Sequence, residues 1–153
     1  MTDFQAIADR VEIEALRGDY TDAAMMCDYD RMATLFTPDG ALRMPNVPVD
    51  LVGPEQIRAF GGRREEMVEL FVQTTHPGTI RLDGDSASGR AYMSEVIRLR
   101  DGGSYVNYAI YHDRYQRTQD GWRFSERVYE IRYLDTTPLG GSAPQPAGSS
   151  ANP

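Results

Sequence analysis

The fold is decided by residues 71–134, which run FVQTTHPGTIRLDGDSASGRAYMSEVIRLRDGGSYVNYAIYHDRYQRTQDGWRFSERVYEIRYL. Three turn motifs interrupt this stretch, at Asp83-Gly84-Asp85, Asp101-Gly102-Gly103 and Gln119-Asp120-Gly121-Trp122. Asp-Gly pairs between apolar, aromatic-rich runs favour hairpins, because the turn needs a positive φ and glycine adopts it without a steric cost. The stretch therefore predicts a curved antiparallel meander of four strands, over about 71–82, 87–99, 105–117 and 122–134.

Helical patterns precede the meander. Apolar residues recur on one face over about 4–27, behind a capping residue at Thr2 or Asp3, and Gly18 is a point where this helix could bend or divide. The order of helices before strands predicts an α+β fold, with the helices covering one face of the sheet. The remaining predicted elements are a short helix over 29–36, a strand over 40–44, an irregular crossing over 45–52, and a helix from 53 to 70 broken near Gly61-Gly62.

Length and composition fit one domain, with 153 residues of which 41% are apolar. The formal net charge of −7 disfavours nucleic-acid binding, because an acidic surface repels phosphates. The single cysteine, Cys27, excludes an internal disulfide and a thiolate zinc cage. No run approaches the ~20 apolar residues of a membrane span, and no secretion signal is visible, so a cytoplasmic protein is expected.

The last residues differ in composition from the rest of the chain. Residues 138–153 are mostly Pro, Gly, Ser and Ala, with one large apolar residue, Leu139. Such a segment cannot bury enough surface to offset its ordering entropy. We therefore expect a single domain over 1–137 and a flexible tail over 138–153.

His76 is the first candidate for chemistry. Alternation along the first long strand groups it with the aliphatic residues Ile80 and Leu82, which predicts that its side chain points toward the buried face. A buried imidazole that titrates near neutrality can move protons in either direction. The alternative is a hydrogen-bonded core histidine with no chemical role. His112 is expected to be structural or exposed.

A carboxylate and a set of tyrosines accompany this histidine. Glu95 alternates in phase with Met93 and Ile97, so it either points inward or forms a salt bridge with an arginine of a neighbouring strand. Tyrosines combine an apolar ring with a polar tip, which suits a pocket that orients an oxygenated ligand, although most serve as ordinary packing. Those of the meander are Tyr92, Tyr105, Tyr108, Tyr111, Tyr115, Tyr129 and Tyr133.

The pattern resembles the SnoaL-like branch of the nuclear transport factor 2-like superfamily, in particular the subgroup that contains scytalone dehydratase, lindane dehydrochlorinase and bile acid 7α-dehydratase. The likeness covers roughly residues 5–140. It implies a cone-shaped α+β barrel around a single apolar pocket, with no metal and no organic cofactor. The resemblance rests on the following residues and motifs: Tyr20 in the long first helix, Leu35-Phe36-Thr37-Pro38-Asp39-Gly40, Gly53-Pro54-Glu55-Gln56-Ile57, His76-Pro77-Gly78-Thr79, and Tyr111-His112-Asp113-Arg114-Tyr115 leading to Asp120-Gly121-Trp122-Arg123-Phe124.

The resemblance also implies roles for single residues. In the subgroup a histidine of the first long strand is the general base, aided by an aspartate late in the first helix; His76 matches the histidine, but Met25 stands at the aspartate position. Methionine can neither hold the tautomer of the imidazole nor stabilise an imidazolium by charge. Tyr20 matches a tyrosine that polarises a substrate oxygen, with core packing as its alternative role. Positions that line the pocket or its rim in relatives are matched by Asn107, Tyr111, Arg127 and Arg132.

Two functions follow as expectations. An enzyme is favoured: a cofactor-free lyase or isomerase, of the dehydratase or cyclase type, that acts on a small apolar oxygenated molecule such as a polyketide, terpenoid or steroid. The alternative is a non-catalytic small-molecule-binding protein, for which Met25 is the main support. Epoxide hydrolysis ranks last, because its Asp-Arg-Asp arrangement cannot be placed. A homo-oligomer, trimer or dimer, is expected as in relatives, and neither nucleic acid nor a membrane is expected as a partner.

Overall fold

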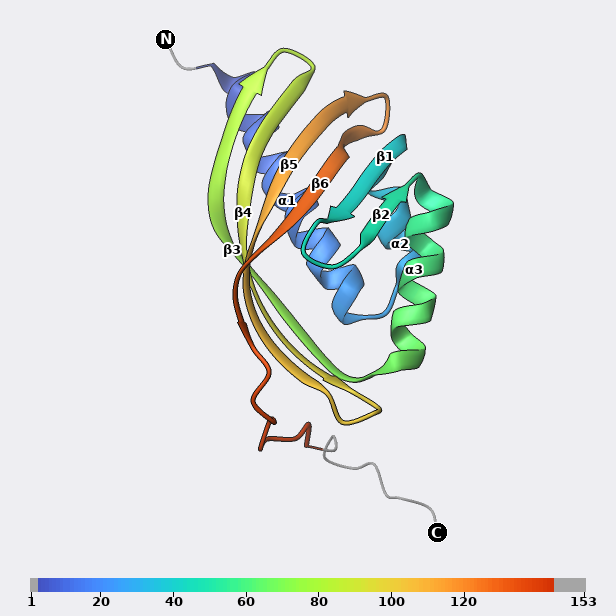
Figure 1. Ribbon diagram of the computed structural model, residues 1–153. Helices are drawn as coiled ribbons and strands as arrows, with labels where there is room; N and C mark the ends of the chain where they lie inside the picture. Colours follow the sequence, from blue (N-terminus) through green and yellow to red (C-terminus); the bar gives the residue numbers. More distant parts are fainter. Residues whose placement is uncertain (1–2, 145–153) are drawn as a thin grey trace.

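The computed structural model describes residues 3–144 and confirms the α+β class. A single bent sheet carries the strands in the order β2-β1-β6-β5-β4-β3. Helix α1 lies against one face of this sheet, and α2 and α3 lie beside β1 and β2 (Figure 1). The elements are α1 (Phe4–Met25), α2 (Tyr29–Thr34), β1 (Phe36–Met44), β2 (Val49–Val52), α3 (Pro54–Met67), β3 (Val68–Asp83), β4 (Ser86–Leu99), β5 (Ser104–Thr118) and β6 (Gly121–Asp135).

The sheet is mixed and open, and in this it differs from the predicted antiparallel sheet. Strands β3 to β6 form the expected meander, but β1 pairs with β6 in parallel. The sequence of β1 shows that it is a strand and does not show which strand it joins. Residues 49–52, expected as an irregular crossing, form the edge strand β2.

The two long helices are continuous, whereas the sequence allowed a bend or division at Gly18 and predicted a break near Gly61-Gly62. Helix α1 begins where the Asp3 carboxylate accepts hydrogen bonds from the backbone of Gln5 and Ala6. It runs through Gly18 without a break. Helix α3 likewise runs through Gly61, where a side chain would collide with the Tyr29 ring. Close packing of two helices therefore explains this glycine.

The core lies between α1 and the face of the sheet that α1 covers, called here the inner face. Tyr20 of α1 packs edge-on against Phe36 and Phe124, with ring centroids 6.1 and 5.9 Å away. Trp122 is fully buried, and its indole N–H donates to the Asp9 carboxylate of α1 across 3.0 Å. These contacts fix α1 on the inner face.

Residues after β6 form no helix or strand as far as 144. The remainder of the predicted flexible tail, 145–153, lies outside the described residues. Among residues 3–144, no helix is both long and apolar enough to cross a membrane.

Candidate functional site

Four buried polar side chains meet on the inner face of the sheet, one from each strand of the meander. They form the inner polar row, defined as Gln73 of β3, Glu95 of β4, Asn107 of β5 and Tyr129 of β6. Strand pairing positions the first three, because Glu95 is the register partner of both Gln73 and Asn107. Side chains directly opposite each other on one face of a sheet lie within contact distance.

The Glu95 carboxylate is the centre of this row. It accepts hydrogen bonds from Gln73 Nε2 at 2.5 Å, from the Tyr129 hydroxyl at 2.7 Å and from Asn107 Nδ2 at 3.4 Å. These neutral donors satisfy a carboxylate that is only 7% exposed. Of the two alternatives for Glu95, the inward orientation is found, and the salt bridge with an arginine is not found among residues 3–144.

Two groups of the row bear on proton transfer and ligand binding. Burial raises the pKa of Tyr129, and the Glu95 carboxylate raises it further, so the hydroxyl is protonated at neutral pH. The side-chain oxygen of Asn107 is buried, and no hydrogen-bond donor within the described part of the chain reaches it. It is therefore an unused hydrogen-bond acceptor in the inner polar row.

Helix α1 contributes Met25 and Thr21 beside the row. The backbone N–H of Gln73 donates to Met25 Sδ across 3.1 Å, and the Thr21 hydroxyl donates to Gln73 Oε1 across 3.4 Å. The residues that face each other between helix and strand are thus Met25 and Gln73. Neither side chain exchanges protons, so the histidine–aspartate pair that the resemblance implies is absent from this position.

The prediction that His76 points toward the buried side is wrong. His76 is exposed on the outer face of the sheet, where Nε2 lies 3.2 Å from the Ser94 hydroxyl. The pairing of β3 with β4 shifts between His76 and Thr79, and such a bulge reverses the side-chain phase. Ile80 packs on the core after the shift, whereas Val72 before it is exposed, so they do not share one face.

Tyr20, Tyr111 and Arg127 come together on the inner face. The two hydroxyls lie 3.3 Å apart, and the Arg127 guanidinium lies over both rings. Burial raises the pKa of each tyrosine. Arg127 forms two hydrogen bonds with Asp113, at 2.8 and 3.0 Å, and both side chains are buried. This pair holds β5 to β6, which is a structural role.

Arg132 does not join the inner polar row. It alternates with Ile131, which packs against the core, and its side chain is 63% exposed. Its guanidinium lies 3.5 Å from Glu130. Adjacent strand residues point to opposite faces, so an inward Ile131 places Arg132 outside.

A cleft of about 260 Å³ opens where α1 and α3 end and β3 begins. It is polar as well as apolar, in contrast to the single apolar pocket expected. The Arg64 guanidinium lies over the Phe71 ring at 3.5 Å from its centroid. Burial raises the pKa of Tyr29 to about 12, with a further contribution from Cys27. The lining residues are Met25, Cys27, Tyr29, Arg64, Glu65, Val68, Glu69, Phe71 and Arg100.

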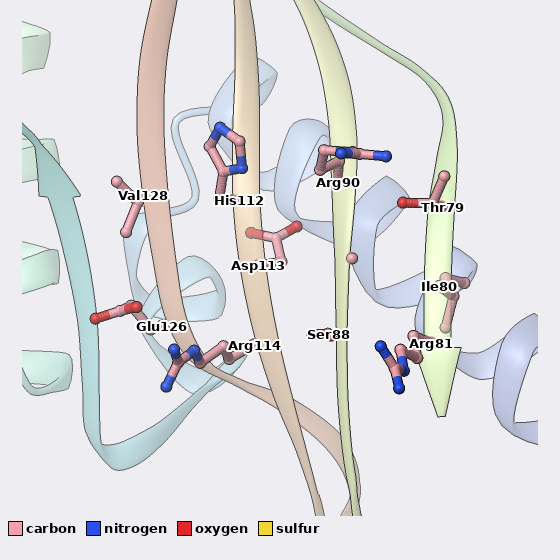
Figure 2. A pocket seen from close by; sticks show the side chains of 11 residues that line it. Thr79, Ile80, Arg81, Ser88, Arg90, His112, Asp113, Arg114, Glu126 and Val128 are labelled. Carbon is pink, nitrogen blue, oxygen red and sulfur yellow. The ribbon is translucent and has the colours of Figure 1, made fainter. Parts of the chain in front are cut away.

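Met25 links this cleft to the inner polar row, because it lines the cleft and also contacts Gln73. A second hollow, on the outer face of the sheet, is shown in Figure 2. Gln73 and Tyr129 were missed as site residues. The register across the Asp101-Gly102-Gly103 turn already places Asn107 opposite Glu95, but nothing in the sequence shows that Tyr129 reaches Glu95 from β6.

The chain belongs to the SnoaL-like domain family, whose model matches residues 5–128. It is 28% identical over 125 residues to an uncharacterized protein of Mycobacterium tuberculosis, a match that covers 80% of this chain and 84% of the relative. An uncharacterized protein of Mycobacterium bovis matches with the same identity over the same share of both chains.

Solved structures share the fold. The hexachlorocyclohexane dehydrochlorinase LinA-type3 of Novosphingobium barchaimii superposes with a TM-score of 0.80 at 21% identity, covering 95% of this chain and 99% of that one. A protein provisionally assigned as a scytalone dehydratase, from Novosphingobium aromaticivorans, gives a TM-score of 0.77 at 17% identity over 95% and 97% of the two chains. At these identities the likeness shows the fold alone.

Proposed function

We propose that the protein is a cofactor-independent lyase or isomerase, of the dehydratase or cyclase type, with Glu95 in place of His76 as the general base. The environment of Glu95 is the observation that carries the proposal. Its carboxylate is buried and held by neutral donors, and it forms no salt bridge within residues 3–144. A base of this kind, fixed in place and free of a counter-charge, suits proton abstraction from a bound molecule.

In an elimination, Glu95 takes the proton from a carbon next to a carbonyl group, and the C–H electron pair forms the new double bond. The departing oxygen takes the proton of the Tyr129 hydroxyl and leaves as water. Glu95 then returns its proton to Tyr129 across their 2.7 Å hydrogen bond, which restores both groups. The same pair performs a double-bond shift if the proton returns to a different carbon of the substrate.

The surroundings support a small, mostly apolar, oxygenated substrate such as a polyketide, terpenoid or steroid-like compound. Partly buried apolar side chains, including Phe60, Phe71 and Ile131, pack against the core, and Phe71 also lines the cleft. The unpartnered Asn107 oxygen would accept a hydrogen bond from a substrate hydroxyl. Met25 would move to let the substrate pass from the cleft, which its flexible thioether allows.

A second function, binding without chemistry, is favoured by Met25 and Gln73, because neither can transfer a proton at the position where they meet. The two functions share the inner polar row and differ in what the Glu95 carboxylate does there. In the binding protein it only completes a hydrogen-bond network.

The test uses 2-tetralone, a bicyclic ketone with an acidic C–H group, in D₂O. Deuterium exchange at that carbon is followed by proton NMR, and binding by saturation transfer. The enzyme proposal expects exchange above the buffer rate, and expects Glu95→Gln to bind the ketone while losing exchange by ~10²–10⁴-fold. Binding with no exchange above buffer in the unmodified protein would support the second function instead.

The proposal includes a cytoplasmic location and a homo-oligomer, trimer or dimer. The single cysteine, Cys27, supports a reducing compartment. Exposed aromatic side chains on the sheet, among them Tyr92, Tyr108 and Tyr133, support self-association. Light scattering on a sizing column measures the oligomeric state.

A further inference from the structure

The outer face of the meander carries a hollow of about 530 Å³ across β3 to β6 (Figure 2). Arg81, Arg90 and Arg114 line it and define the outer arginine groove, with Ser88 between them. All four residues are exposed. The groove is separate from the inner polar row, because α1 and the core lie on the opposite face of the sheet.

Strand register fixes the spacing of the three arginines. Ser88 is the partner of Arg81 on one side and of Arg114 on the other. Neighbouring strands lie ~4.8 Å apart, so the backbones of these two arginines are roughly 10 Å apart. Arg90 follows Ser88 by two residues on the same face. Because the serine side chain is short, it leaves a depression between Arg81 and Arg114, and Figure 2 shows the Arg114 guanidinium on the side of Glu126.

The charge of the groove is not balanced by the acids beside it. Within residues 3–144, none of the three arginines has a carboxylate at salt-bridge distance. Glu126 lines the groove as the register partner of Arg114, and its carboxylate accepts a hydrogen bond from Arg43 Nε at 3.1 Å. The Glu130 carboxylate, close by on β6, lies 3.2 Å from His112 Nε2. A bound anion would supply the counter-charge that the three arginines lack among residues 3–144.

We propose that the outer arginine groove binds a small molecule that carries two or more linked phosphoryl groups. Each guanidinium presents parallel N–H donors that match a phosphoryl group in two-point contacts. Arg81 and Arg114 lie two strand spacings apart, a separation that two linked phosphoryl groups can bridge. A local cluster of this kind is distinctive in a chain whose net charge is −7.

The probe is inorganic pyrophosphate, titrated by calorimetry and by amide NMR at low ionic strength, with sodium chloride of equal ionic strength as the blank. We expect saturable binding with shifts at residues of the groove. Arg114→Gln should weaken binding by about tenfold or more, because it removes charged hydrogen bonds. The matched control is Arg63→Gln, which removes one exposed charge from α3 and should leave the affinity unchanged.

Several results would overturn the proposal. These are an absence of saturable binding, equal affinity in Arg114→Gln and the unmodified protein, and equal affinity for orthophosphate and pyrophosphate. A dimer that Arg114→Gln dissociates, without pyrophosphate binding, would assign the groove to a second copy of the chain. Glu95→Gln should bind pyrophosphate normally, so failure of the proposed catalysis and failure of the groove are distinguishable.

Discussion

Tyr129 on β6 donates its hydroxyl hydrogen to Glu95 on β4 across 2.7 Å, with strand β5 lying between their two strands. Glu95 is thereby tied to three other strands, through Gln73 on β3, Asn107 on β5 and Tyr129 on β6. A buried carboxylate needs such donors to remain in the core. The contact links the stability of the sheet to the chemistry proposed for it.

Removing that hydroxyl should destabilise the fold. Tyr129→Phe leaves Glu95 buried with one donor fewer, and the free energy of unfolding should fall by ~1–3 kcal/mol. Urea denaturation measures the loss. Tyr133→Phe is the control, because its ring is 55% exposed on the same strand. Equal effects of the two substitutions would show that the Tyr129–Glu95 contact contributes nothing specific.

The buried ion pair between Asp113 and Arg127 should be costly to break. Asp113→Asn leaves the Arg127 guanidinium buried without its counter-charge, and unfolding free energy should drop by ~3–5 kcal/mol. Thermal and urea denaturation report the change. Glu130→Gln removes a surface carboxylate, and its effect should stay within ~1 kcal/mol. A loss of that small size in Asp113→Asn would mean that Arg127 is well solvated.

Asp9 should make stability depend on pH in the acid range. Hydrogen bonds from Arg117 above all, and from Trp122, hold the pKa of its carboxyl well below the ordinary 3.8. A depressed folded-state pKa stabilises the protein above the ordinary pKa, and this contribution is lost progressively as the pH falls below it. Asp9→Asn should therefore be less stable than the unmodified protein at neutral pH, with the difference shrinking in acid.

Trp122 fluorescence during urea unfolding follows this difference, because the indole donates directly to Asp9. Asp120→Asn, an exposed acid, serves as the control and should show no such trend. A stability difference that is constant from neutral to acid pH would contradict the role of Asp9.

Met25 and Gln73 offer a constructive test of the site. Met25→Asp alone adds a carboxylate where no imidazole faces it, so deuterium exchange of 2-tetralone should not increase. Met25→Asp combined with Gln73→His places an acid–base pair at the contact that now joins them. In a Glu95→Gln background, this double change should raise exchange above that of Glu95→Gln alone. If it does not, the contact does not face the bound ketone.

The hairpins were predictable because Asp-Gly turns and alternating strands carry local sequence patterns. The parallel pairing of β1 with β6 was not predictable, because it depends on which segments, far apart in the sequence, meet in the fold. Alternation along β4 allowed an inward Glu95 but left the salt bridge open as an alternative. The inward side chain is found, and β4 and β5 pair without a shift over their whole length. His76 was placed on the wrong face, because the shift after it leaves no mark in the alternation.

The central claim concerns which residue moves the proton, and exchange rates of two variants decide it. In D₂O, the His76→Ala variant should catalyse deuterium exchange of 2-tetralone as fast as the unmodified protein, because the His76 ring lies on the outer face. In the Glu95→Gln variant the exchange rate should fall by ~10²–10⁴-fold, while circular dichroism shows that the fold is retained. The reverse outcome, exchange lost in His76→Ala and kept in Glu95→Gln, would contradict the account.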